Sequence, residues 1–154
     1  MQTDDIRIPQ ALEIAEERGI VVSFGQAILR EAHPNTAQLI LHGRSGQRLE
    51  IIGQSLGGSR INIAQLDGIE TNFSGESPTL VVYNEDRPGH VSEVTTMLSN
   101  QNINIASMRL YRSSRGGEAV MVVECDQEVP ESGIDWLRGF DGIRKVTYLG
   151  MTGE

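Results

Sequence analysis

The stretch T-L-V-V-Y-N-E-D-R-P-G, residues 79–89, decides the fold of the second half of this 154-residue chain. Its first five residues are mostly β-branched or aromatic, which predicts a strand. The polar run at 84–86 ends that strand, Pro88 and Gly89 turn the chain, and apolar residues at helical spacing from Val91 to Leu98 predict a helix. A helix that follows a polar loop presents unpaired N–H groups that suit a carboxylate. The join is therefore a candidate ligand site, although purely structural joins have the same composition.

The rest of the second half completes a compact pattern around that stretch. Asn102–Tyr111, Glu118–Asp126 and Ile143–Leu149 have the composition of strands, and Ile134–Phe140 has that of a short helix. The order β-α-β-β-α-β is that of a ferredoxin-like sandwich, in which helices cover one face of an antiparallel sheet.

The third predicted strand carries apolar side chains on both faces, with Val120 and Val122 on one and Ala119, Met121, Val123 and Cys125 on the other. Two helices cover only one face of such a sheet, so the second face needs another cover. A partner subunit is the simplest candidate and predicts a homodimer through Asn102–Tyr111 or its neighbouring helix. The alternative cover is the first half of the same chain, which would leave a compact monomer.

The first half predicts an antiparallel sheet with a helix before it. Residues Ile8–Arg18 form a helical pattern that Gly19 can end, and short strands are expected at Ile20–Phe24 and Ala27–Arg30. Four strand-like runs follow, separated by turn residues: Ala37–His42, Arg48–Gln54, Arg60–Leu66 and Ile69–Ser74. Apolar and polar residues alternate along them, so one face of the sheet is buried, and the N-terminal helix is its expected cover.

The expected boundary between the two halves lies at Ser74–Pro78, where Gly, Ser and Pro cluster between two apolar runs. This gives a first domain at residues 1–75, a second at 76–154, and the α+β fold class.

Composition excludes several classes of function. A net charge of −8 argues against unspecific binding to nucleic acid or to an anionic membrane, and no apolar run is long enough to span a bilayer. The acidic start M-Q-T-D-D lacks the apolar region of a secretory signal. The single cysteine, Cys125, lies in an apolar run and is expected to be buried and inert. These features favour a cytoplasmic protein.

The loop N-E-D-R-P-G, the predicted strand order and N-I-N-I-A at 102–106 together resemble an ACT domain. ACT domains are small regulatory modules that commonly pair side by side and bind amino acids at the pair interface. A wider series resembles the iron–sulfur L-serine dehydratase (L-serine ammonia-lyase) β chain of bacteria: D-D-I-R-I-P at 4–9, H-P-N-T-A at 33–37, G-G at 57–58 and S-G-E-S-P-T-L at 74–80.

The resemblance implies a regulatory portion of that enzyme, with an allosteric substrate-binding domain followed by an ACT domain. Its partner would be an α chain carrying the 4Fe-4S cluster, because the single cysteine here cannot hold one. An S-S-S-H-T motif that normally begins the family's β chain does not occur in the sequence. No catalytic residue, nucleophile motif or metal spacing is found, so the chain is not expected to be catalytic alone. The alternative is a stand-alone amino-acid sensor or the regulatory tail of a phosphoglycerate dehydrogenase.

Four residues are candidates for effector binding in the ACT half. This half also resembles the C-terminal domain of D-3-phosphoglycerate dehydrogenase, where an H-E-N-R-P-G loop and an N-I-A asparagine bind L-serine. Asn84, Asp86 and Asn104 match the histidine and the two asparagines of that site, so two of the three residue types differ. Asp86 would hold an α-ammonium group, with amides beside it and Gly89 permitting close backbone approach. The alternative is that Asp86 caps the following helix and Arg87.

A second set of candidates lies in the first half. His33, Asn35 and Thr36 are placed together by a proline turn, and Gly57, Gly58 and Arg60 resemble an anion-binding turn. Ordinary turn chemistry explains both groups as well. His42 and His90 are expected to be isolated from any carboxylate or thiol partner.

Overall fold

The computed structural model describes residues 5–29, 32–58 and 60–151, and divides the chain into two compact units. The first includes residues 5–29 and the second runs from His33 to Met151. The elements of the second unit, in chain order, are β1 (Thr36–His42), β2 (Arg48–Gly57), β3 (Arg60–Leu66), β4 (Ile69–Phe73), β5 (Thr79–Glu85), α2 (His90–Asn100), β6 (Ile105–Arg112), β7 (Glu118–Cys125), α3 (Glu131–Arg138) and β8 (Ile143–Leu149). None of the helices in the described ranges has the length and apolar character needed to cross a membrane.

The first unit contains a 3₁₀ turn, η1 (Ile8–Gln10), that runs into a short helix, α1 (Ala11–Glu17). The helix expected at 8–18 is therefore confirmed, and it ends where Gly19 adopts a φ of 70°. The strands expected at 20–24 and 27–30 are wrong for every described residue, and Arg30 lies outside the described residues. A strand needs a hydrogen-bonded neighbour, and this segment has none within the described part of its unit. Its Val21 and Phe24 are 96% and 82% exposed.

The first sheet, called sheet A below, consists of β1–β4 in sequential antiparallel order. All four strands were predicted from the sequence, with ends that differ by no more than a few residues. The β3–β4 turn places Asp67 and Gly68 at φ values of 45° and 84°, as a two-residue hairpin of this kind requires. One face carries Leu49, Ile51 and Ile63, and the opposite face is largely polar.

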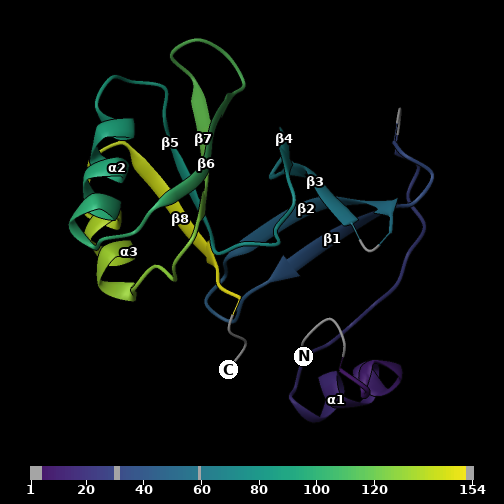
Figure 1. Ribbon diagram of the computed structural model, residues 1–154. Helices are drawn as coiled ribbons and strands as arrows, with labels where there is room; N and C mark the ends of the chain where they lie inside the picture. Colours follow the sequence, from purple (N-terminus) through teal and green to yellow (C-terminus); the bar gives the residue numbers. More distant parts are fainter. Residues whose placement is uncertain (1–4, 30–31, 59, 152–154) are drawn as a thin grey trace. The chain divides into compact units, whose positions relative to one another are not determined.

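The second sheet, called sheet B, has the strand order β6-β7-β5-β8 that defines the ferredoxin-like sandwich. All neighbouring strands are antiparallel, and β5 pairs with β7 from Thr79–Glu124 to Glu85–Glu118. The helices α2 and α3 both lie on one face of this sheet (Figure 1). The expected βαββαβ pattern is confirmed, and β6 and β8 form its edges.

The helix-covered face of sheet B holds the larger core. Leu80, Val82, Met121 and Val123 point from the strands toward Val94, Met97 and Leu98 of α2 and Ile134 and Leu137 of α3. Most of these side chains are fully buried, so their burial drives the docking of both helices.

The second face of sheet B packs against the apolar face of sheet A. Val81, Val120 and Val122 from sheet B form one buried cluster with Leu66 and Phe73 from sheet A. The strand-face assignment of Val120 and Val122 was therefore correct. Of the two covers considered from the sequence, the chain's own first half is the one that the structure shows, and the partner subunit that was the simplest candidate is not needed to bury these valines. The N-terminal helix was the predicted cover for the apolar face of sheet A. That face packs against sheet B instead.

Polar contacts join the two sheets at both sides of this cluster. Lys145 of β8 donates hydrogen bonds to the Asp67 carboxylate at 3.0 Å and to the Arg48 carbonyl at 3.1 Å. On the other side, the Tyr111 hydroxyl of β6 bonds both backbone groups of Asn72 in β4. Both sheets therefore belong to one unit, although residues 74–78 separate them in the chain. The division into domains at residue 75 remains a prediction.

Candidate functional site

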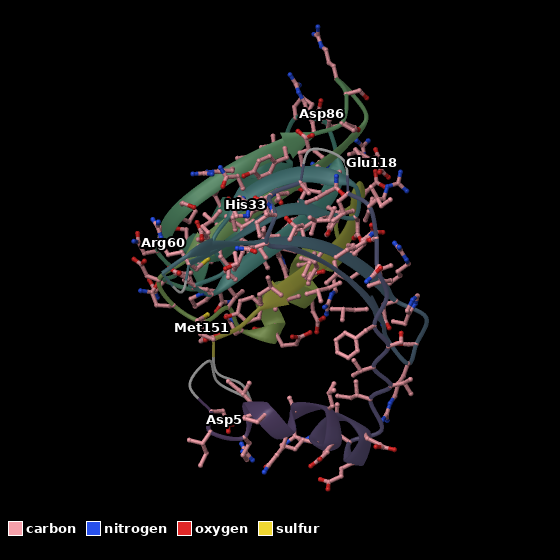
Figure 2. The ribbon with its side chains drawn as sticks, turned by 90° about the vertical axis from the view of Figure 1, so that its right-hand side faces the viewer. Asp5, His33, Arg60, Asp86, Glu118 and Met151 are labelled. Carbon is pink, nitrogen blue, oxygen red and sulfur yellow. The ribbon has the colours of Figure 1, made fainter. Side chains whose placement is uncertain are left out.

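Asp86 lies just after β5, beside the start of β7 near Glu118 (Figure 2). Its Oδ2 accepts a hydrogen bond from Gly116 N at 2.9 Å and contacts Arg112 Nη1 at 3.2 Å. The Gly116 hydrogen bond and the Arg112 guanidinium hold the pKa of this carboxyl below its usual value, against a smaller opposing effect of desolvation. Asp86 is thus an anion already tied to the β6–β7 hairpin.

The prediction that Asp86 caps the next helix is wrong. Helix α2 begins at His90, its N-cap is Gly89 with a φ of 112°, and no side chain caps it. A positive φ of this size is accessible mainly to glycine, so Gly89 sets the entry to the helix. Within the described chain, Asp86 instead makes its hydrogen bonds across the sheet.

Asn84 is 3% exposed at the end of β5, on the helix-covered face of sheet B. Its Nδ2 donates to the Glu85 carbonyl at 2.7 Å, which fixes the orientation of the amide. Its Oδ1 is buried and finds no hydrogen-bond partner in the part of the chain that the structure describes. Such an acceptor costs free energy unless a donor reaches it, so it is a position where a ligand donor would be favoured.

His90 is a residue of this region that the sequence reasoning placed wrongly. It is 5% exposed, and its Nδ1 lies 2.8 Å from Oε2 of Glu93. The expectation that His90 lacks a carboxylate partner is therefore incorrect. The helical spacing i, i+3 was the signal that could have found the pair. Because Glu93 accepts, Nδ1 carries a proton, and Nε2 is buried without a partner among the described residues.

Asn104 lies at the opposite end of sheet B from Asp86. It precedes β6, where its Nδ2 donates to Asp126 at 2.6 Å and its backbone N donates to Gln127 at 2.7 Å. Asp86 instead adjoins Arg112, at the far end of the same strand. With a rise of about 3.3 Å per residue, the eight residues from Asn104 to Arg112 separate the two candidates by about 26 Å along β6. A single chain does not bring the predicted effector residues together.

The first-half candidates gather at one end of sheet A. His33 Nδ1 accepts from Asn35 N at 3.2 Å, and Thr36 Oγ1 donates to the His33 carbonyl at 2.5 Å, so these residues form a self-bonded turn. The Asn35 carbonyl in turn accepts from Ser55 N of β2 at 2.9 Å. This bond brings the turn to the strand end that carries the glycine pair. In Figure 2 this region, marked by His33 and Arg60, lies away from Asp86.

The glycine pair forms an open turn between β2 and β3. Gly57 and Gly58 have φ values of 80° and 60°, and a Cβ added to either would meet nothing within 4 Å. Positive φ, rather than crowding, is therefore the reason for glycine here. Arg60 pairs with Gly57 across the turn and makes no ion pair within residues 5–29, 32–58 and 60–151. The arrangement leaves a cation beside an open, positive-φ turn, as an anion site would need.

Cys125 ends β7 and is 1% exposed, which confirms the expectation of a buried thiol. Burial, with a smaller effect from the neighbouring Asp126 charge, raises the pKa of this thiol to about 11. Metal binding and nucleophilic attack need the thiolate, so Cys125 is suited to neither at neutral pH.

Comparison with known proteins identifies the second half directly, since residues 79–138 match the family model described as ACT domain. Over 147 residues the chain is 35% identical to the "Probable L-serine dehydratase, beta chain" of Bacillus subtilis, covering 96% of this chain and 66% of the relative. The present chain is a homologue of L-serine dehydratase beta chains and carries an ACT domain. The L-serine dehydratase beta chain of Peptoniphilus asaccharolyticus is 28% identical over 149 residues, covering 96% of this chain and 67% of that one.

This homologue spans about two thirds of the length of those beta chains. The resemblance stated from the sequence is confirmed, and the beta-chain relatives together with the ACT domain support a regulatory subunit. The chain is also similar to D-3-phosphoglycerate dehydrogenase of Methanocaldococcus jannaschii, 31% identical over 146 residues that cover 95% of this chain but 27% of that enzyme.

Proposed function

We propose that this chain is the amino-acid-sensing and assembly portion of an iron–sulfur L-serine dehydratase, an enzyme that converts L-serine to pyruvate and ammonia in the cytoplasm. The similarity to two beta chains along nearly the whole of this chain carries the proposal. Its partner would be an α chain that contributes the active site. Regulation would follow from an amino acid binding one arrangement of the subunits better than another.

The residues of this chain do not fit an iron–sulfur cluster. Such a cluster needs several thiolates, whereas the sequence contains one cysteine and that thiol is buried with a raised pKa. The cluster would therefore belong to the α chain. The contribution of the present chain would be to bind an effector and to hold the partner, without a catalytic group of its own.

The effector site would form between two copies of the chain. Asn104 and Asp86 lie at opposite ends of β6, and β6 is an edge strand of sheet B. Antiparallel pairing of two β6 strands about a twofold axis would place Asn104 of the partner subunit near Asp86 and Arg112. The unpartnered Asn84 Oδ1 and the Asp86 carboxylate would then accept an α-ammonium group.

The first-half residues would contribute a separate anion site. His33, Asn35 and Thr36 lie at the strand end that carries Gly57, Gly58 and Arg60. The open turn and the Arg60 guanidinium would together receive a carboxylate or phosphate group. Arg60→Gln should weaken binding of such an anion, and unchanged binding would contradict this site.

Co-purification with an α chain tests the assembly. The chain should be captured by a tagged dehydratase α chain from the same organism and should confer an amino-acid response on its activity. Failure of capture would contradict the dehydratase assignment. Sedimentation equilibrium tests the pairing of two β6 strands. One 16.9 kDa species at all micromolar concentrations would contradict the homodimer and its shared site.

The alternative function is a free amino-acid sensor or the regulatory tail of a phosphoglycerate dehydrogenase. The similarity to the Methanocaldococcus jannaschii enzyme, which covers 95% of this chain, favours this candidate over other regulatory roles. Binding of an amino acid without capture by any α chain would support it.

A further inference from the structure

Strand β1 is an edge of sheet A, and among the described residues it pairs with β2 alone. Its seven residues include no proline, no Asp, Glu, Lys or Arg, and its pairing with β2 contains no bulge. Each of the other three edge strands of the two sheets carries charge: Glu70 in β4, Arg109 and Arg112 in β6, and Arg144 and Lys145 in β8. Charges, prolines and bulges are the features that keep a free edge from pairing with another chain. Strand β1 lacks them and is therefore the edge most open to a further strand.

The side chains of β1 are apolar on both of its faces and are only half covered. Leu39 and Leu41 pair with residues of β2 that belong to the apolar face of sheet A, so both lie on that face. Ile40 pairs with Glu50 and lies on the opposite face. All three apolar side chains of β1 are about half exposed, at 49%, 48% and 50% in chain order. A strand added to this edge would therefore find apolar neighbours on either face.

Residues 20–28, called the arm below, have the composition that such a strand needs. Their sequence, I-V-V-S-F-G-Q-A-I, contains no charge, and the described chain gives them no strand partner. Val21 and Ile28 are 96% and 98% exposed. Alternate residues of an extended strand share a face, so an apolar face would be formed by Ile20, Val22 and Phe24. The arm thus presents to water the kind of apolar surface that usually marks an interaction site.

We infer that the arm of one copy of this chain adds as a strand to β1 of a second copy, and that the exchange is mutual. A single chain leaves both apolar surfaces exposed, and a second copy supplies the match for each at once. The net charge of −8 opposes self-association, and this repulsion is least where both surfaces are uncharged.

Mutual exchange doubles the contact, because each copy contributes an arm and an edge strand. This doubling brings the buried area toward the about 800 Å² per partner of a standard interface. The apolar face of the arm continues the face of Leu39 and Leu41, and Val21 lies on the side of Ile40. The inference goes beyond the proposed amino-acid sensing and requires neither that function nor the pairing of two β6 strands.

Disulfide trapping between two different variants tests the exchange. The native thiol Cys125 is buried, so an introduced cysteine is the accessible one. Oxidation of a mixture of Val21→Cys and Ile40→Cys chains should join residue 21 of one variant to residue 40 of the other, as identified by mass spectrometry. Ser23→Cys replaces Val21→Cys if the register is shifted by two residues, which keeps the side chain on the same face.

Val91→Cys, an exposed position on α2, is the control and should give no such product with Ile40→Cys. A disulfide that forms only within single chains of the double variant Val21→Cys/Ile40→Cys would overturn the exchange and assign the arm to its own β1. Absence of the disulfide from every combination would also overturn it.

Sedimentation equilibrium of the full chain gives a second measurement. Val21→Lys and Ile40→Lys should each raise the dissociation constant of the dimer more than tenfold, whereas Val91→Lys should leave it within twofold. Far-UV circular dichroism should be unchanged for all three, since each replaces an exposed side chain. Equal weakening by Val91→Lys would overturn the inference.

Leu110→Lys separates this interface from the one proposed at β6, where Leu110 is 47% exposed. Dissociation by Leu110→Lys, with no effect of Val21→Lys or Ile40→Lys, would overturn the arm exchange and leave the proposed function standing. Dissociation by the arm and β1 variants, with no effect of Leu110→Lys, would support the exchange and contradict the β6 pairing.

Discussion

The two faces of sheet B are both buried but by different means. On one face, α2 and α3 come from crossovers within the same βαββαβ unit, and most of the side chains beneath them are fully buried. On the other face, sheet A supplies the cover, and a small buried cluster is surrounded by partly buried residues such as Leu49, Ile63 and Tyr111. A cover built into the supersecondary motif is thus more complete than one brought from elsewhere in the chain. The difference should appear in the cost of mutations on the two faces.

The largest effect is expected beneath the helices. Leu98→Ala removes a side chain with 0% exposure and should lower the free energy of unfolding by about 3 kcal/mol, the loss of transfer free energy plus a cavity. Urea unfolding followed by far-UV circular dichroism measures it. Val91, on the same helix but 43% exposed, is the control, and Val91→Ala should cost less than about 1 kcal/mol. Equal losses would contradict the assignment of the core.

A matched pair of valines tests the comparison itself. Val82 lies on the helix-covered face of sheet B and Val122 on the face covered by sheet A, and both side chains are at most 2% exposed. We expect Val82→Ala to cost about 2 kcal/mol and Val122→Ala about 1 kcal/mol, since a looser surround can collapse into the space. The same urea experiment gives both values. A larger loss for Val122→Ala would reverse the ranking of the two faces.

The smallest effect concerns the ion pair at the margin of the sheet–sheet contact. Burial opposes ionisation of Asp67, but hydrogen bonds from Glu50 N and Lys145 outweigh it and hold the pKa of the carboxyl below the ordinary value of an aspartic acid. A depressed folded-state pKa adds stability above the unfolded pKa, and that stability is lost as the pH falls through the folded value.

Asp67→Asn should therefore cost about 0.5 kcal/mol at pH 7, a value reduced for solvent screening. The difference from the wild type should shrink as the pH falls below about 4. Thermal unfolding between pH 7 and pH 3 measures it. Parallel curves for the two proteins over this range would show that the Asp67 charge contributes nothing.

Sequence patterns predicted the elements of sheet A and sheet B because both signals are local. Alternation along β1–β4 and the N-E-D-R-P-G loop depend on residues a few positions apart. The cover of Val120 and Val122 could not be predicted in the same way. Two-sided apolarity shows that a face is buried, but a partner and a distant sheet leave the same pattern. The apolar run at Ile20–Phe24 shows the converse, since strand composition without a neighbouring strand gave no strand there.

The candidate sites show the same difference between features that depend on neighbouring residues and features that depend on distant ones. His33 and the Gly57–Gly58 turn are brought to one strand end by the register of β1 and β2, which the hairpin pattern already implied. The distance between Asp86 and Asn104 was not predictable from motif order, because it depends on which end of β6 each residue adjoins. The His90–Glu93 pair was missed although its spacing is local.

The position of Cys125 has a practical kinetic consequence. Its sulfur is the only thiol in the chain. It belongs to β7, the inner strand of sheet B that pairs with the edge strand β6. A thiol reagent can therefore reach it only during an opening of that sheet, and the labelling rate measures how often the opening occurs. Following this rate with and without a bound amino acid would show whether the ligand stiffens sheet B. The native chain thus contains its own single-site probe of dynamics, with no engineered cysteine.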